Sequence, residues 1–348
     1  MVKVLIVDDS QTIREYFQEI FDMDPDLKVV GLAKNGEEAV KMVKTLNPDV
    51  VTMDIQMPVM DGYEATRQIM ESHPVPIVIV SSTWDSTQVH HTFKALEVGA
   101  VTGITKPQGI GAENFEKDIT QLIQTIKLMS EVKVIKRRQF NSKNLSKPSC
   151  NNRSLSVSKK FDIIAIGAST GGPPVIQTIF SKLSKSLPVP IVVVQHIAPG
   201  FIDGLVDWLK QTTGFSIQIG CDKQFVQPGN VYFAPDGYQM KIMRNKQIVL
   251  TKDPMENSIR PSVSYLFRSI ANNFADKAIA VLLTGMGRDG AQELKQLRNL
   301  KAITIAQNRE TSIVYGMPGE AAKLDASMYS LSPDEIADHI NKLFNMNS

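Results

Sequence analysis

The chain has 348 residues, 43% of them hydrophobic, which is longer than one ordinary domain and predicts two. Its formal net charge of +2 gives no reason to expect nucleic acid as a partner, and its two cysteines fit neither a disulfide framework nor a metal site. Because no apolar run approaches the roughly 20 residues that span a bilayer, we expect a soluble, cytoplasmic protein without direct membrane insertion.

Residues 1–125 alternate short apolar runs with segments of helical periodicity. The predicted strands are residues 3–7, 29–33, 50–53, 77–80 and 101–105. Helices are predicted between them, for example around Ile13, Phe17 and Ile20 and again at residues 87–98. Continuous Val/Ile/Leu strands separated by helices indicate a parallel sheet covered on both faces. The first domain is therefore predicted to be a doubly wound, five-stranded α/β domain.

Polar residues follow four of these strands. Asp8 and Asp9 follow the first strand, Asp54 the third, Ser81 the fourth and Lys106 the fifth. Carboxyl ends of parallel strands meet at one edge, so three carboxylates are expected in one crevice. Such a cluster favours a hard cation such as Mg²⁺. Any one aspartate alone is more simply a helix cap or a turn residue, but the five together favour a binding site.

These residues belong to longer motifs. The motifs are VDDS at 7–10, MDIQMPVMDG at 53–62, SS at 81–82 and KP at 106–107. Over about residues 1–125 they resemble a two-component receiver domain. The resemblance implies that Asp54 accepts a phosphoryl group, with a chemotaxis histidine kinase as the donor. It also implies a Mg²⁺ site made of Asp8, Asp9, Asp54 and the backbone carbonyl of Gln56.

The receiver resemblance also assigns switch residues. Ser81 is implied to sense the phosphoryl group and Lys106 to pair with it. Gly103 departs from the pattern, because many receivers carry there an aromatic residue that changes rotamer on activation. Signalling through such a ring is therefore not expected in this chain.

Residues 126–160 are predicted to be an interdomain linker. From residue 131 to 160, nine basic residues accompany a single acid, Glu131. Few large apolar residues are present, so this segment cannot build a core. A solvated linker is the favoured interpretation, and a docking strip for an acidic partner or for the other domain is the alternative.

Residues 161–348 return to the α/β rhythm and are predicted to form a second, Rossmann-like domain. Predicted strands are residues 161–167, 189–195, 230–234, 278–284 and 302–306, with helices such as 201–211 and 290–300. Segments 230–234 and 239–251 have tighter turns and are predicted to be hairpin strands. Nothing in this half has the pattern of a helix-turn-helix.

A serine motif follows the first strand of this half. Residues 167–171 read G-x-S-x-G, and prolines then permit a helix to start. A strand-turn-helix of this kind projects the hydroxyl of Ser169 at a helix N-terminus. A Gly-rich turn here could instead hold a phosphate, although neither the P-loop nor the G-x-G-x-x-G spacing is present.

A histidine and an aspartate are predicted to lie beside this serine. Of five histidines, only His196 ends a buried strand in the second half, and Asp289 lies in a Gly-rich turn after another strand. Taken alone, His196 could be structural and Asp289 a helix cap. Their shared sheet edge with Ser169 favours a triad, in which Ser169 attacks a carbonyl, His196 carries the proton and Asp289 fixes the tautomer.

The second half closely resembles the catalytic domain of the chemotaxis protein-glutamate methylesterases. The motifs are IGASTGGP at 166–173, VQH at 194–196, PGF at 199–201, RPSV at 260–263, LLTGMGRDG at 282–290 and VYGMP at 314–318. The resemblance implies phosphorylation-activated hydrolysis of glutamate γ-methyl esters on chemoreceptors with release of methanol, and deamidation of receptor glutamines. It places the backbone N–H of Met286 in the oxyanion hole and implies no cofactor in this domain.

Some features leave alternatives open. The order Ser…His…Asp argues against the α/β-hydrolase family. Gln239 replaces a common histidine and Ser264 a common aspartate, which we expect to affect substrate preference or rim contacts. A phosphorylation-dependent binding module with an inactive serine site and a receiver-controlled transcription factor are the rival interpretations. We also hypothesise that the unphosphorylated receiver packs over the crevice of Ser169.

Overall fold

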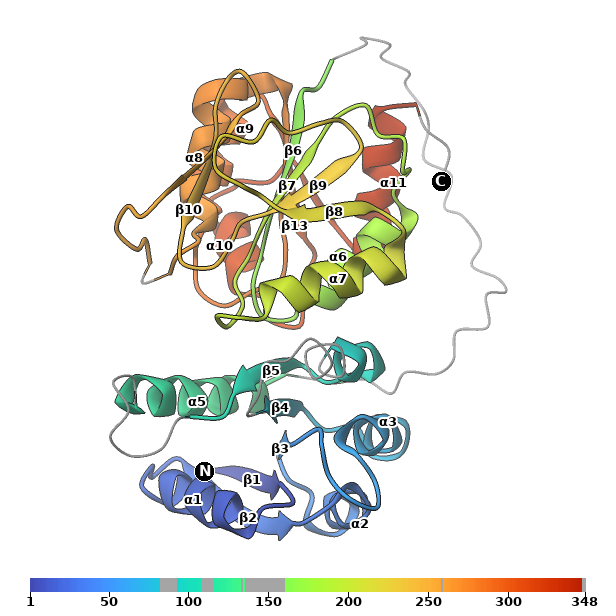
Figure 1. Ribbon diagram of the computed structural model, residues 1–348, viewed down its shortest axis with the longest axis vertical. Helices are drawn as coiled ribbons and strands as arrows, with labels where there is room; N and C mark the ends of the chain where they lie inside the picture. The colour runs from blue at the N-terminus through green and yellow to red at the C-terminus, as the bar shows by residue number, and fades with distance from the viewer. Residues whose placement is uncertain (82–92, 108–114, 133, 135–159, 258, 346–348) are drawn as a thin grey trace.

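The computed structural model describes residues 1–81, 93–107, 115–132, 134, 160–257 and 259–345. The described residues form two α/β bodies that pack against each other (Figure 1). The expected two-domain α/β architecture is therefore confirmed. The basic residues of the predicted linker lie almost entirely outside the described ranges, as do His90, His91 and the first part of the helix predicted at 87–98.

The receiver half contains a five-stranded parallel sheet in the order β2-β1-β3-β4-β5. Its strands are β1 (Val2–Val7), β2 (Leu27–Ala33), β3 (Val50–Met53), β4 (Ile77–Ser81) and β5 (Thr102–Thr105). Its helices are α1 (Gln11–Asp22), α2 (Gly36–Leu46), α3 (Gly62–Ser72) and α5 (Phe115–Ser130), and residues 93–98 are also helical. Every residue of β3 and β4 is buried, as strands covered on both faces require.

Helix α5 runs past the predicted domain boundary at residue 125. Ile126 and Met129 are buried in the receiver core, so the helical face continues to gain contacts there. The boundary at 125 therefore falls inside a helix of the receiver.

The second half is built on a seven-stranded sheet in the order β14-β13-β12-β6-β7-β9-β8, with every pair parallel. Its strands are β6 (Ile163–Ala168), β7 (Ile191–Gln195), β8 (Ser216–Ile219), β9 (Asn230–Phe233), β12 (Ala278–Leu282), β13 (Ile303–Gln307) and β14 (Tyr329–Leu331). Its helices are α6 (Gly172–Lys182), α7 (Ile202–Thr213), α8 (Val263–Phe274), α9 (Ala291–Asn299), α10 (Met317–Lys323) and α11 (Pro333–Leu343), with a 3₁₀ turn at Ala275–Lys277.

The pairing predicted for one strand was wrong. Segment 230–234 was expected to be a hairpin strand, but β9 is a parallel strand between β7 and β8. Val231, Tyr232 and Phe233 are buried, which explains why this short strand lies inside the sheet. β10 (Gln239–Ile242) and β11 (Ile248–Thr251) form the antiparallel hairpin expected in segment 239–251, and this hairpin is separate from the main sheet.

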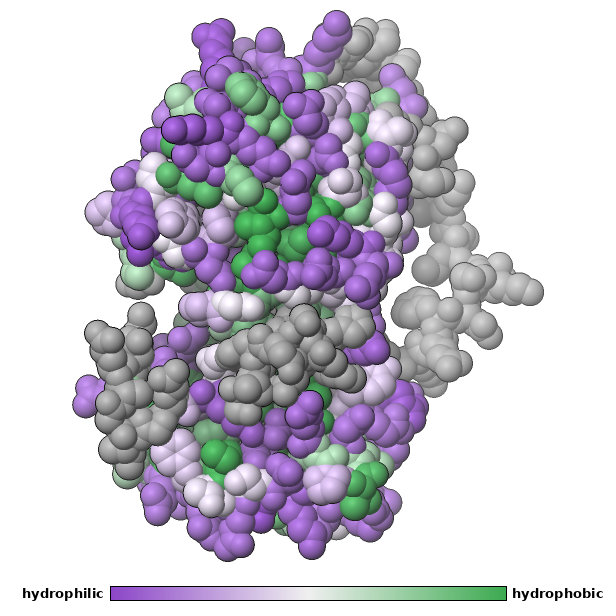
Figure 2. Space-filling model, in the orientation of Figure 1, coloured by the Kyte–Doolittle hydropathy of each residue, from purple (hydrophilic) through white to green (hydrophobic). Residues whose placement is uncertain are grey.

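The two halves meet through the 93–98 helix and α5 of the receiver and through α6 and α7 of the second half (Figure 1). The rings of Phe93 and Trp208 stack with centroids 5.2 Å apart. Glu97 Oε1 accepts hydrogen bonds from Gln177 Nε2 and Trp208 Nε1, both at 2.9 Å. Figure 2 shows the halves joined at a narrow waist, with apolar surface just above it. None of the described helices is long and apolar enough to cross a bilayer.

Val59 carries backbone strain in the loop between β3 and α3. Its φ is 70° although it is β-branched, and its side chain is 80% exposed, so packing does not require valine there. We expect Val59→Asn to stabilise the receiver by about 1 kcal/mol, because asparagine tolerates the left-handed region better. The free energy of unfolding is measured by urea denaturation, monitored through hydrogen exchange of the amides in β1 and β3. Val40→Asn, on the helical backbone of α2, is the control and should destabilise. A lower midpoint for Val59→Asn contradicts the strain argument.

Candidate functional site

Three adjacent strands bring the predicted triad residues together. In the sheet, β12, β6 and β7 are neighbours. Ser169 follows β6, His196 follows β7, and Asp289 lies in the loop between β12 and α9. All three line one cavity of about 920 Å³ at the carboxyl edge of these strands. The structure therefore places the serine, the imidazole and the carboxylate where the strand pattern predicted them.

The turn that holds Ser169 is tightly packed. Its N–H donates to Thr284 O at 3.0 Å, which joins it to the loop after β12. A Cβ on Gly285 would lie 2.5 Å from Ser169 Cβ, so only glycine permits this approach. Gly171 has φ 76°, the left-handed conformation that starts α6 without strain. The serine is thus fixed at the N-terminal end of α6, next to Thr170.

Gln195 ties the serine loop to the histidine loop, a role that the sequence analysis missed. Its Nε2 donates to Ser169 O at 2.8 Å and to His196 O at 2.7 Å. The residue is 3% exposed, so these bonds form in a desolvated position. A Cβ on Gly172 would lie 2.2 Å from Gln195 Oε1, so the glycine makes room for the amide. The sequence signal for this role was an amide side chain at the end of an apolar strand, at Gln195.

His196 contacts Asp289 directly. His196 Nε2 lies 3.0 Å from Asp289 Oδ2, and the two side chains are 9% and 1% exposed. The distance fits a hydrogen bond, although its angle is not that of a well-aligned one. In the part of the chain that the structure describes, no hydrogen bond joins Ser169 Oγ to the ring. Catalytic hydrogen bonds often tighten only when substrate is present.

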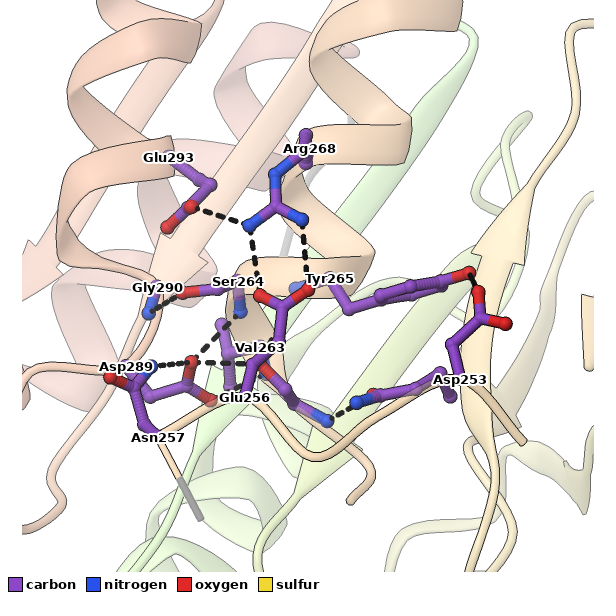
Figure 3. Close-up of polar contacts among 12 residues, drawn as sticks. Asp253, Glu256, Asn257, Val263, Ser264, Tyr265, Arg268, Asp289, Gly290 and Glu293 are labelled. Carbon is purple, nitrogen blue, oxygen red and sulfur yellow. Dashed lines mark hydrogen bonds and ion pairs between the residues drawn. The ribbon is translucent and has the colours of Figure 1, made fainter. Parts of the chain in front are cut away.

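Asp289 is held by the first turn of α8 (Figure 3). Its oxygens accept from Ser262 Oγ (2.8 Å), Val263 N (2.6 Å), Ser264 N (3.1 Å) and Asn257 Nδ2 (3.0 Å). Burial alone raises the pKa of Asp289, but the hydrogen bond to His196 and those to α8 outweigh it and hold the pKa well below its ordinary value. The carboxylate therefore stays ionised next to the imidazole.

The two departures from the family pattern lie behind Asp289 instead of at the rim. Gln239 is fully buried; its Oε1 accepts from Ser262 N at 2.9 Å and its Nε2 donates to Pro254 O at 3.1 Å. Ser264 is 5% exposed, and its Oγ accepts from Gly290 N at 2.9 Å. Neither side chain lines the cavities of Ser169, so an effect through rim contacts is not supported, whereas an effect on substrate preference stays a prediction.

The cavity also offers free N–H groups close to the serine. Thr170 and Met286 both line it, and the side chain of Met286 is 44% exposed. Within the described ranges, neither backbone N–H makes a hydrogen bond. Two unpaired donors beside a buried hydroxyl form the kind of arrangement that stabilises a developing oxyanion.

The predicted carboxylate cluster forms at the edge of the receiver sheet. Asp8, Asp9 and Asp54 each offer an oxygen within 4.8 Å of the others. Asp8 and Asp54 are 1% and 8% exposed, whereas Asp9 faces solvent. Three carboxylate oxygens at this spacing fit the hard-cation site expected from the sequence.

Lys106 supplies the positive charge at this cluster. Its Nζ lies 2.6 Å from Asp8 Oδ2 and 2.9 Å from Asp54 Oδ2. Burial raises the pKa of Asp54, and Lys106 offsets this only in part. Burial also disfavours the charged form of Lys106, but the attraction of Asp54 and Asp8 outweighs it and raises the pKa of the amine. Ser81 ends β4, is 3% exposed, and accepts at its carbonyl from Lys106 N at 2.8 Å.

Arg14 is a further residue of this edge that the sequence analysis missed. From α1, its Nη1 donates to Asp8 O at 2.7 Å and to Asp9 O at 2.9 Å. These bonds fix the backbone of the two aspartates, so their carboxylates point into the crevice without forming ion pairs with Arg14. An arginine on an amphipathic helix gives no sequence signal for this role.

The fold and the two sites together define a receiver domain joined to an α/β domain of the serine-hydrolase type. Comparison with known proteins agrees: residues 4–114 match the response regulator receiver domain and residues 164–340 match CheB methylesterase. The chain belongs to the CheB methylesterase family. This membership excludes the transcription-factor interpretation.

Relatives resemble the chain over its full length. The protein-glutamate methylesterase/protein-glutamine glutaminase 4 of Geobacter metallireducens is 49% identical over 344 residues, covering 99% of both chains. The corresponding protein 1 of Syntrophus aciditrophicus is 47% identical over 345 residues, covering 99% of this chain and 98% of the relative. The crystal structure of the Thermotoga maritima CheB methylesterase catalytic domain has a TM-score of 0.51 and 34% identity, covering 53% of this chain and 99% of that one.

The Ser262 hydroxyl is the side-chain contact by which the start of α8 holds Asp289, and substitution of this residue tests that contact. We expect Ser262→Ala to slow labelling of Ser169 by a fluorophosphonate roughly tenfold, because a hydrogen bond to a charged group contributes about 1.5–3 kcal/mol. The matched control is Ser269→Ala on the same helix, which loses bonds with Ile242 N and Leu266 O instead. Equal labelling rates for Ser262→Ala and Ser269→Ala would show that this contact does not orient the triad.

Proposed function

We propose that the chain hydrolyses glutamate γ-methyl esters on chemoreceptors, releasing methanol, and deamidates receptor glutamines, under the control of phosphorylation at Asp54. The observation that carries this proposal is the convergence of Ser169, His196 and Asp289 on one cavity, with His196 Nε2 3.0 Å from Asp289. Membership of the methylesterase family and the names of the full-length relatives support the substrate class. The receiver half supports control by a phosphodonor.

In the proposed mechanism, Ser169 Oγ attacks the γ-carbonyl of the substrate glutamyl group. Since Nε2 of His196 faces Asp289, Nδ1 is the nitrogen left to take the serine proton. The imidazolium then gives that proton to the leaving methanol or ammonia, and water attacks the acyl-serine with the same ring as base. Asp289 stays ionised throughout and stabilises the imidazolium.

The oxyanion of each tetrahedral intermediate is assigned to the N–H groups of Thr170 and Met286. The resemblance of the Gly-rich turn at 285–290 implies Met286, and the unpaired N–H of Thr170 in the same cavity supports its inclusion. Loss of one such donor typically costs about 3–4 kcal/mol of transition-state stabilisation.

In the receiver, Asp54 is the proposed phosphoacceptor. Asp8, Asp9 and Asp54, with the carbonyl of Gln56, would hold Mg²⁺, which supplies the positive charge that lets the three carboxylates ionise together. Lys106 pairs with the phosphoryl oxygens, and Ser81 donates its hydroxyl to them. The phosphodonor is a histidine kinase of the chemotaxis system, and the protein acts in the cytoplasm on the receptors.

The unphosphorylated receiver restricts access to Ser169 in this proposal. Receiver residues of α5 line the catalytic cavity, among them Gln121 and Leu128. Phe93 and Glu97 hold the receiver against Trp208. Phosphorylation raises turnover by shifting the population away from this packed arrangement, which requires only that the phosphoryl group favour the separated state.

Substitution of Ser169 and substitution of Asp54 are predicted to remove two different activities. Ser169→Ala should abolish methanol release from methylated receptors while leaving phosphorylation of Asp54 intact. Asp54→Asn should leave basal release unchanged and remove its stimulation by a small-molecule phosphodonor. Methanol release and incorporation of labelled phosphate measure the two effects. Release at the parent rate by Ser169→Ala would refute the assignment of the nucleophile.

Glu97 is predicted to hold the inhibited arrangement. Glu97→Ala removes the acceptor of two hydrogen bonds that only the packed state makes, so we expect roughly tenfold higher turnover without phosphorylation, which corresponds to about 1.4 kcal/mol. Turnover with a phosphodonor should not change. Glu116→Ala, on the exposed side of α5, is the control. Unchanged basal turnover in Glu97→Ala would show that these bonds do not favour closure.

A further inference from the structure

One face of α5 is turned toward the catalytic half. Gln121, Gln124, Thr125 and Leu128 line the 920 Å³ cavity, and their spacing of three and four residues places them on one side of the helix. The opposite side is buried in the receiver core through Leu122, Ile126 and Met129. The direction of this face is therefore set by the packing of the receiver itself.

The same cavity contains the catalytic residues. Ser169, His196, Asp289 and Met286 line it together with the two glutamines. Gln121 also lines a second, smaller cavity of about 210 Å³ together with Ser169 and His196. Gln121 therefore lines both of the cavities that reach Ser169.

The amides of Gln121 and Gln124 are not engaged elsewhere. Both residues are exposed, and among the described residues their side chains make no hydrogen bond. By contrast, the amides of Gln195, Gln239 and Gln307 are all tied to backbone groups. The two α5 glutamines therefore present unpaired γ-carboxamides to a site proposed to hydrolyse that group.

We propose that α5 is an internal substrate and that Gln121, with Gln124 as the second candidate, is deamidated by Ser169 of the same chain. This inference rests on the proposed glutaminase activity. Ser169 Oγ bonds to the glutamine Cδ, and the C–N bond breaks as ammonia leaves with the proton that His196 took from the serine. Water then replaces Ser169 at the acyl carbon, so each event consumes one water and yields glutamate and ammonia.

Peptide mass spectrometry of the full-length protein tests this proposal. Trypsin releases residues 118–127, which contain both glutamines, and fragmentation separates Gln121 from Gln124. In water enriched in heavy oxygen, we expect labelled glutamate to accumulate at Gln121 or Gln124 in the parent protein and not in Ser169→Ala. Gln18 of α1, which lines neither catalytic cavity, reports the background rate. Label at neither position, or equal label in Ser169→Ala, overturns the proposal.

A mixing arm distinguishes reaction within one chain from reaction between chains. Tagged Ser169→Ala chains incubated with parent chains should stay unmodified, because the geometry joins α5 to the serine of the same molecule. Label in the tagged chains at the parent rate overturns the intramolecular assignment. Methanol release from methylated receptors is measured on the same preparation: release without label at either glutamine refutes this inference alone, whereas loss of both refutes the proposed function as well.

Discussion

The catalytic half depends on keeping one carboxylate buried and charged. Taking an ion such as Asp289 out of water costs several kcal/mol unless other groups replace its hydration. Here the first turn of α8 does so with two backbone N–H groups and the Ser262 hydroxyl, aided by the positive end of the helix dipole. Gln239 holds Ser262 in turn, which gives the β10–β11 hairpin a role in the site. Arg268 further anchors the intervening loop through Glu256 (Figure 3). The packing of α8 therefore positions Asp289, and Asp289 in turn orients the imidazole of His196.

Local patterns were sufficient to predict both crevices, because most key residues directly follow a buried strand and Asp289 lies in the loop after one. Asp54 and Ser169 could be placed at a sheet edge from periodicity alone, and the parallel order β12-β6-β7 brought His196 and Asp289 to the same edge. Residues that support the sites were not predictable in this way. Gln195 acts across 26 positions of chain on Ser169, and Ser262 across 27 on Asp289, so their partners are set by tertiary packing. The edge strands β8 and β14 were missed because they are short and largely uncovered.

The two crevices handle buried carboxylates in opposite ways. Asp289 has five contacts, three with the N-terminus of α8, one with Asn257 and one with His196, and its pKa is lowered. Asp54 has Lys106 nearby, but Asp8 shares that same ammonium, and burial raises the pKa of Asp54. The catalytic carboxylate is therefore fully compensated by the protein, whereas the receiver cluster leaves negative charge for an added cation. This difference fits the proposed roles, in which Asp289 stays ionised and Asp54 reacts with a phosphoryl donor.

Coupling between the crevices needs no long path. Lys106 directly follows β5, and Ser81 is the last residue of β4. Gly103 and Ile104 of β5 line the small cavity shared with Ser169 and His196. One short strand thus reaches the proposed phosphorylation site at its end and the cavity of Ser169 and His196 along its length. Gly103 has no ring to rotate, so under the proposed regulation β5 and the adjoining 93–98 helix are the elements placed to connect the two sites. The packed state includes one stacked ring pair and two hydrogen bonds to Glu97, each worth about 1 kcal/mol. Ile313 and Val314 of the second half also pack against the receiver core. Moving such an equilibrium from almost closed to almost open takes about 5.5 kcal/mol, so a phosphoryl group at Asp54 would have to favour the open state over the closed one by that amount.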